Sequence, residues 1–167
     1  MSSVPIDSGI SGLGEDLDFA FPLETIWDLD EVERLPARTL AYIGDAVYEL
    51  GVRLQHVKSS PNAAGKLHSS VVSVVCAAHQ ARLFADILPT LKGKEEILLK
   101  HWRNAKLPSR PHAGASKGEY ARSTAFEAWV GYLFLTGQQS RLQSVFRLAR
   151  TIAGSKPGAE PAPPDEE

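Results

Sequence analysis

Residues 39–57, TLAYIGDAVYELGVRLQHV, carry apolar side chains at steps of three and four, which predicts an α-helix with one buried stripe. The stripe consists of Leu40, Ile43, Val47, Leu50, Leu54 and Val57. Asp45 lies in the middle of this segment, although aspartate is a poor helix former and its charge is costly to bury without a partner. Asp45 is therefore the first candidate functional residue.

A second acid lies in even more apolar surroundings, within residues 117–136. Glu127 is flanked by Phe126 and Ala128, in a helical segment that is apolar on nearly all sides and so belongs in the centre of a protein. The simplest joint explanation of Asp45 and Glu127 is a shared divalent cation, since two carboxylates and several waters commonly hold Mg²⁺ near a phosphate. The alternative is that each acid is neutralised separately, by Arg38, Arg122 or a backbone donor. The pattern alone leaves both explanations open.

The rest of the chain also reads as helices, with no convincing strand alternation. Gly137 is expected to end the helix that contains Glu127. Residues 1–20 and 154–167 are rich in Ser, Gly, Pro and acids and are expected to be disordered arms. The sequence thus predicts a single all-α domain over residues 21–153, with helices at about 36–57, 64–78, 78–90, 93–103, 117–136 and 138–153.

The charge of the chain is unevenly distributed. The net charge is −2, but residues 1–34 hold nine acids against one base, and the tail from residue 154 holds four acids against one base. Of the 18 basic and 20 acidic residues, 16 and 7 remain in residues 35–153, which therefore carry a net charge of +9. A middle region this basic suits a polyanionic partner, although a solvated Lys/Arg-rich surface would have the same composition.

Other features bear on the cellular compartment. Cys76 is the only cysteine, so no intrachain disulfide can form, and we expect a reducing environment with Cys76 in the core. No apolar run is long enough for a membrane span, and the N-terminus lacks a basic-then-apolar export signal. These features predict a cytoplasmic protein without a membrane partner.

Motifs for other chemistries are lacking. There is no Glu-x-x-His pattern of a di-iron bundle and no zinc-ligand spacing among the five histidines. GISGLG has the wrong glycine order for a dinucleotide-binding turn and follows no predicted strand, and KGKE lacks the hydroxyl residue and the spacing of a phosphate-binding loop. The two acids remain the best candidates for a reactive site.

Two stretches, LAYIGDAVYEL at 40–50 and STAFEAWVGYLFLTG at 123–137, resemble the catalytic domain of the ribonuclease III family. With RNAK at 103–106 between them, the order of the motifs is most similar to the short branch of that family, the Mini-ribonuclease III proteins. The resemblance extends from about Leu35 to Ala153 and is weaker in KLHSSVVSVVCAAHQARLF, residues 66–84.

The resemblance implies a helical, homodimeric endoribonuclease domain that cuts double-stranded RNA with Mg²⁺, for which Mn²⁺ can substitute. By position, Asp45 and Glu127 match the two metal-binding, catalytic acids of the family. The resemblance further implies maturation of the large-subunit (23S) ribosomal RNA precursor, with a possible ribosomal protein as helper.

The chain departs from full-length members of the family at three outer acidic positions. Arg38 and Ala41 stand where glutamates are usual, and Thr124 stands where aspartate is usual. The short branch also lacks this outer set, so the departures point to that branch. A Pro-containing stretch, LPSRPHAGAS, follows RNAK and departs from the short branch as well.

Full-length members also have a C-terminal double-stranded-RNA-binding domain, whereas only 14 residues follow Ala153 here. We therefore expect the catalytic domain itself to contact RNA phosphates, through the basic segment at residues 100–122. The alternative is an ordinary basic loop. The candidate RNA-binding residues are Lys100, Arg103, Asn104, Lys106, Arg110, Lys117 and Arg122.

The competing function is a non-catalytic double-stranded-RNA- or ribosome-binding helical protein derived from a nuclease. A pure binder gains nothing from negative charge that faces phosphate, so the presence of both acids favours the enzyme. A helical adaptor without an RNA partner would leave the basic middle of the chain unexplained.

Overall fold

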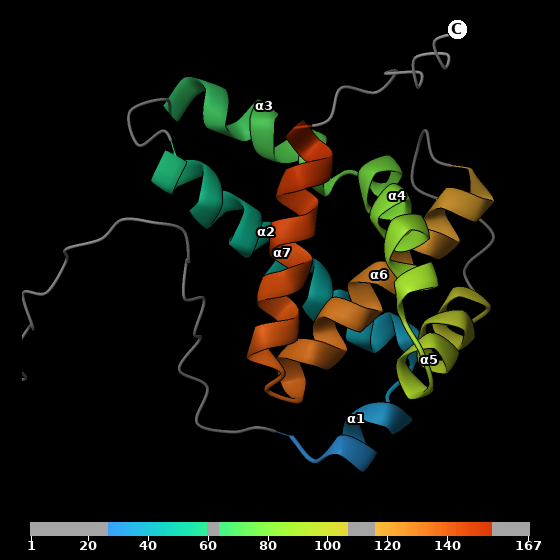
Figure 1. Cartoon of the computed structure of the whole chain (residues 1–167). Helices are drawn as coiled ribbons and strands as arrows, with labels where there is room; N and C mark the ends of the chain where they lie inside the picture. The colour runs from blue at the N-terminus through green and yellow to red at the C-terminus, as the bar shows by residue number, and fades with distance from the viewer. Residues whose placement is uncertain (1–26, 60–63, 107–115, 155–167) are drawn as a thin grey trace, which may run out of the picture.

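The computed structural model describes residues 27–59, 64–106 and 116–154, in which all regular structure is helical (Figure 1). The all-α prediction is confirmed, and each of the six predicted helices is present within a few residues of its expected bounds. The predicted arms, 1–20 and most of 154–167, lie outside the described residues. The elements are α1 (Leu29–Arg34), α2 (Ala37–Ser59), α3 (Ala64–Val75), α4 (Ala77–Ile87), the 3₁₀ turn η1 (Leu88–Thr90), α5 (Lys94–Arg103), α6 (Lys117–Leu135) and α7 (Gln139–Gly154).

The short helix α1 was not predicted. Asp28 caps it, since its carboxylate accepts hydrogen bonds from the backbone N–H groups of Asp30 (2.9 Å) and Glu31 (3.3 Å). Val32 is the only residue of α1 that is buried. A six-residue helix with one buried side chain is too short to produce a hydrophobic period.

The ends of α6 are defined by local hydrogen bonds. Ser116 and Glu119 form a capping box at its start, in which each side chain accepts from the backbone N–H of the other residue. Gly137 has a positive φ of 68°, and the N–H of Gln138 donates to the carbonyl of Leu133 at 2.8 Å. This is the glycine-terminated helix end that the sequence predicts.

Helix α6 is the centre of the fold. It packs most extensively against α2 and α4, and also contacts α1, α5 and α7 (Figure 1). Phe126 of α6 meets Tyr48 of α2 edge-on at 5.0 Å between ring centroids, and Phe146 of α7 stacks on the other side of Tyr48 at 5.8 Å. The prediction that the nearly all-apolar helix lies in the centre is confirmed.

Helices α2 and α6 touch through their backbones. A Cβ atom added at Gly44 would lie 1.8 Å from the carbonyl oxygen of Glu127, and one added at Gly131 would lie 2.2 Å from the carbonyl oxygen of Leu40. Real Cβ atoms do not approach this closely, so only glycine fits at either position. This crossing brings the neighbouring residue Asp45 beside α6.

The predicted buried stripe of α2 is only half right. Leu40 and Val47 are buried, but Leu50, Leu54 and Val57 are 38%, 40% and 49% exposed. The C-terminal half of α2 extends beyond α6 and has α3 beside it (Figure 1). The apolar stripe of α2 therefore continues beyond the part of the helix that other helices of this chain bury, and its last residues are exposed.

The predicted burial of Cys76 is wrong. Cys76 is exposed, because it lies in the break between α3 and α4, where it precedes the first residue of α4. Its Sγ atom is 3.4 Å from the carbonyl oxygen of Ser73. Val71 and Val74, earlier in the same apolar stretch, are buried instead.

Among the described residues, no single helix has both the length and the apolar composition to cross a membrane. One pair, His68–Val75 and Ala77–Thr90, passes that test only when taken together, and it is bent by 48°.

Candidate active site

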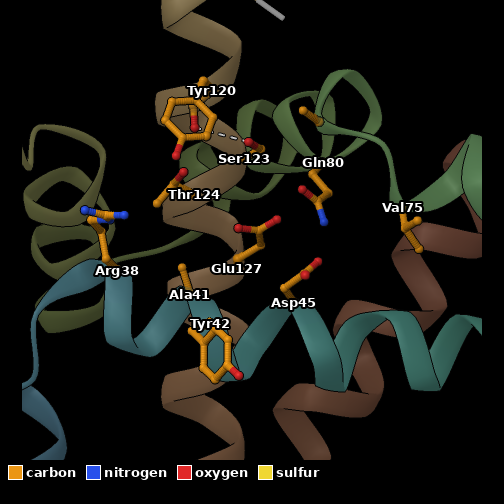
Figure 2. A pocket seen from close by; sticks show the side chains of 11 residues that line it. Arg38, Ala41, Tyr42, Asp45, Val75, Gln80, Tyr120, Ser123, Thr124 and Glu127 are labelled. Carbon is orange, nitrogen blue, oxygen red and sulfur yellow. Dashed lines mark hydrogen bonds between the residues drawn. The ribbon is translucent and has the colours of Figure 1, made fainter. Parts of the chain in front are cut away.

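Helices α2, α4 and α6 line a pocket of about 410 Å³, into which both predicted acids project (Figure 2). Asp45 comes from α2 and Glu127 comes from α6, so residues 82 positions apart in the chain share one pocket. The described residues that line it are Arg38, Ala41, Tyr42, Asp45, Val75, Ala77, Gln80, Tyr120, Ser123, Thr124 and Glu127.

Helical spacing explains why these residues face the same space. Ala41 and Asp45 are one turn apart on α2, and Tyr120, Thr124 and Glu127 follow one another at steps of four and three on α6. The close contact of α2 and α6 at Gly44 brings these two sets of residues next to each other.

The two acids differ in exposure. Asp45 is exposed at the mouth of the pocket, whereas Glu127 is largely covered. The sequence argument that Asp45 is a buried charge is therefore wrong, because the face of α2 that carries Asp45 borders the pocket and not the core. The argument is right for Glu127.

Burial and, to a smaller extent, the negative charge of Asp45 together raise the pKa of Glu127 to about 8. The Gln80 amide acts against this shift, since it is close enough to stabilise the ionised carboxylate. Because ionisation of Glu127 beside Asp45 is unfavourable, Glu127 will either stay protonated or share the pocket with a cation.

The residues present fit a magnesium ion. Among the described residues no group of three or more His, Cys, Asp or Glu side chains could hold a metal ion, so protein ligands at this pocket would be few. Mg²⁺ is commonly bound through one or two carboxylates while it keeps several waters, and it would offset the repulsion between Asp45 and Glu127.

The two arginines proposed as separate counter-charges lie in different places. Arg38 lines the pocket together with the acids. Arg122 lies outside the lining and is close to Glu119, whose pKa it helps to lower after the hydrogen bonds from Ser116. Arg38 is thus the cation that shares the pocket with both acids.

None of the described candidate RNA-binding residues lines the pocket. Lys100 forms an ion pair with Glu96 at 2.5 Å, and Nε of Arg103 donates to Oδ1 of Asn104 at 3.2 Å. Lys100 and Arg103, at the C-terminal end of α5, therefore already have partners within the chain.

The remaining candidates of the basic segment differ in accessibility. Lys106 and Lys117 are exposed and form no ion pair within the part of the chain that is described. Arg122 is half-buried on α6, and Arg110 lies outside the described residues.

Sequence reasoning missed several residues of the lining, among them Tyr42, Gln80 and Tyr120. Tyr42 is 80% exposed and belongs to the YIGDA motif, three positions before Asp45. Gln80 is the least expected, although a glutamine in the apolar stretch 71–87 is a signal of the same kind as Glu127 on α6.

Comparison with known proteins defines the class to which this fold and pocket belong. The sequence model of the Ribonuclease III domain matches residues 38–138, a range that includes both acids. The fold is also similar to that of protein FN1578 from Fusobacterium nucleatum, with a TM-score of 0.64 over 72% of this chain and 96% of that one at 23% sequence identity.

Closer relatives narrow the class to one branch. The chain is 41% identical to Mini-ribonuclease 3 of Symbiobacterium thermophilum, over 69% of this chain and 88% of that protein. It is 34% identical to Mini-ribonuclease 3 of Brevibacillus brevis, over 74% and 94% of the two chains. The chain belongs to the ribonuclease III family, in its Mini-ribonuclease 3 branch, and is an endoribonuclease.

Proposed function

We propose that this endoribonuclease cuts double-stranded RNA with Mg²⁺ held by Asp45 and Glu127. The observation that carries the proposal is that two acids from different helices line one pocket beside a single arginine. Mn²⁺ is expected to substitute for Mg²⁺, because it also accepts carboxylate and water ligands.

Asp45 of α2 and Glu127 of α6 would together hold the cation. A bound Mg²⁺ supplies charge stabilisation at the phosphate and makes a coordinated water more acidic. Glu127 must be ionised to act as a ligand, and binding of the cation favours that form over the protonated one.

Arg38 is the only cationic side chain among the described residues that line the pocket. It is exposed, and a guanidinium can donate two parallel hydrogen bonds to a phosphate. We assign Arg38 to contact with an RNA phosphate next to the acids.

The basic segment would contact phosphates farther along the RNA. Lys106 and Lys117 are its most accessible cations, and Lys100, Arg103, Asn104 and Arg122 would add to them. Duplex RNA is read mainly by shape through the minor groove and the backbone, so contacts of this kind suit a nuclease with little sequence preference.

We further propose that the working form is a homodimer that pairs through α2 and α3. Leu50, Leu54 and Val57 of α2 and Val72 of α3 are all at least 38% exposed, and the two helices pack together. Apolar residues of α6 such as Phe126, Trp129 and Leu133 are buried within the chain, so we assign the interface to α2 and α3. A two-fold dimer would present one pocket to each RNA strand.

A charge in this apolar face tests the dimer. Leu54→Glu should shift the protein from dimer to monomer in sedimentation velocity, whereas Ile97→Glu, which changes an equally apolar and more exposed residue on α5, should not. A wild-type protein that sediments as a monomer contradicts this part of the proposal.

The biological substrate would be the 23S ribosomal RNA precursor in the cytoplasm, with a ribosomal protein as a possible helper. This part rests on the resemblance to Mini-ribonuclease 3 proteins and not on any single residue of the pocket.

Replacement of each acid by its amide tests the metal site. Asp45→Asn and Glu127→Gln should each lower kcat on a double-stranded RNA by on the order of a thousandfold, while the affinity for RNA in Ca²⁺ stays within a few-fold. Glu49→Gln is the matched control, since Glu49 lies one turn after Asp45 on α2 and pairs with Arg53 outside the pocket. Unchanged cleavage by the Asp45 and Glu127 variants would refute the proposed site.

A further inference from the structure

Gln80 lies with the two acids but belongs to neither of the motifs that carry them. It comes from the first turns of α4, is only 1% exposed and lines the pocket. Figure 2 shows its amide group reaching toward Asp45 and Glu127. An uncharged amide is thus placed where three helices meet around the two carboxylates.

The hydrogen bonding of this amide is incomplete. Nε2 of Gln80 is buried and has no hydrogen bond of ordinary geometry among the described residues. Its closeness to Glu127 is nevertheless sufficient to lower the pKa of that carboxyl. A buried donor without a partner destabilises a fold, so its presence in the pocket indicates that another state of the site uses it.

His79, the neighbouring residue, offers an instructive contrast. Its Nε2 is also buried without a hydrogen-bond partner among the described residues, and burial followed by the charge of Arg82 lowers its pKa. His79 does not line the pocket, however. Of the two adjacent unpartnered groups on α4, only that of Gln80 can reach the acids.

We propose that Gln80 is a positioning residue for Glu127, an inference that rests on the proposed metal site. Its Nε2 donates to one oxygen of the ionised carboxylate and leaves the other oxygen for the cation. Hydrogen bonds of this kind orient metal-ligating carboxylates and usually change metal affinity by one to two orders of magnitude.

Gln80→Met removes the donor and keeps the length of the side chain. We expect it to weaken Mn²⁺ binding to the RNA-free protein about tenfold in calorimetric titration, and to lower kcat with little change in KM for RNA. In EDTA its melting temperature should equal or exceed that of the wild type, because a buried unpaired amide is lost. Gln80→Asn, whose amide is one methylene shorter, should bind Mn²⁺ with intermediate affinity.

Gln139→Met is the matched control. Gln139 also has a buried amide atom without a partner among the described residues, but it lies at the start of α7, outside the pocket lining. Its replacement should leave both Mn²⁺ affinity and kcat unchanged.

The same titrations separate failure of this inference from failure of the metal site. If Glu127→Gln abolishes Mn²⁺ binding while both Gln80 variants bind like the wild type, the role of Gln80 is refuted and the metal site stands. If Glu127→Gln also binds normally, the metal site itself is refuted. If both Gln80 variants melt well below the wild type in EDTA, the amide is structural and the inference is overturned.

Discussion

The acid pocket and the described parts of the basic segment, residues 100–106 and 116–122, differ in how much of their surface the fold covers. The pocket is built on three packed helices, and its two acids flank a crossing at which the backbones of α2 and α6 touch. The basic segment runs from the exposed end of α5 to the exposed start of α6, and residues 107–115 between them lie outside the described part of the chain. Under the proposed function, catalysis would depend on closely packed helices, whereas contact with RNA would depend on accessible charge.

Two glycine substitutions test this difference most directly, with the largest expected effect at the pocket. Gly44→Ala should destabilise the protein by at least about 3 kcal/mol, since the new Cβ would collide with the backbone of Glu127. Gly118→Ala, in the basic segment, should stabilise it by about 0.5 kcal/mol, because the nearest atom is an Arg122 nitrogen at 3.5 Å and alanine favours the helix. Urea unfolding of the two variants measures both values.

If the two variants are equally stable, the α2–α6 crossing can relax around an added methyl group. The pocket would then be no more rigid than the basic segment. Gly131→Ala repeats the test from the other helix and should resemble Gly44→Ala.

The next effect is a pH dependence of stability that the pocket should show and the basic segment should not. The pKa of Glu127 is about 8 in the folded chain against an ordinary value of 4.5, so the folded state binds a proton more tightly than the unfolded state does. Without a cation, the free energy of unfolding should therefore fall as the pH rises from about 5 to about 8, by on the order of 2–3 kcal/mol from this group.

Urea unfolding in EDTA across this pH range measures the slope, and Glu127→Gln should remove most of it. Lys106→Ala, in the basic segment, should keep the wild-type slope. A Glu127→Gln protein that loses stability with pH as steeply as the wild type does would assign the effect to other groups.

The smallest effects are expected from the basic segment. Lys106→Ala and Lys117→Ala should each raise KM for double-stranded RNA about two- to fivefold, leave kcat unchanged and make the dependence of log K on log salt shallower by about one unit. Lys92→Ala, which removes an exposed lysine outside the segment, is the control. Binding measurements at several salt concentrations separate these variants from Asp45→Asn, which should change kcat and not the salt dependence.

Much of the fold could be predicted because the core helices are long and clearly periodic. The helix at Ala37–Ser59 and the helix at Lys117–Leu135 were each located to within two residues, and Gly137 was identified as the end of the latter. The helix at Leu29–Arg34 was missed, although Asp28 followed by acids in the first turn is an N-terminal signal.

The exposure of individual residues could not be predicted as well, because a hydrophobic pattern does not specify what covers it. Leu54 continues the stripe of Leu40 but lies beyond α6, and Cys76 lies in a break that interrupts a buried run. Likewise, the composition of the basic segment does not distinguish Lys100, which pairs with Glu96, from Lys106, which is unpaired among the described residues.

Within the pocket, the two acids could be predicted because an apolar setting and a family motif marked the same positions. Gln80 was not predicted: a glutamine in an apolar stretch is a comparable signal, but its place beside the acids depends on the way in which α4 packs against α6.

The two glycines at the helix crossing, Gly44 and Gly131, also affect how the pocket responds to substitutions elsewhere in the domain. The spacing between Asp45 and Glu127 is set where the main chains of α2 and α6 meet and not by the shape of surrounding side chains. Substitutions on the outer surface of the domain should therefore leave the relative position of the two carboxylates unchanged.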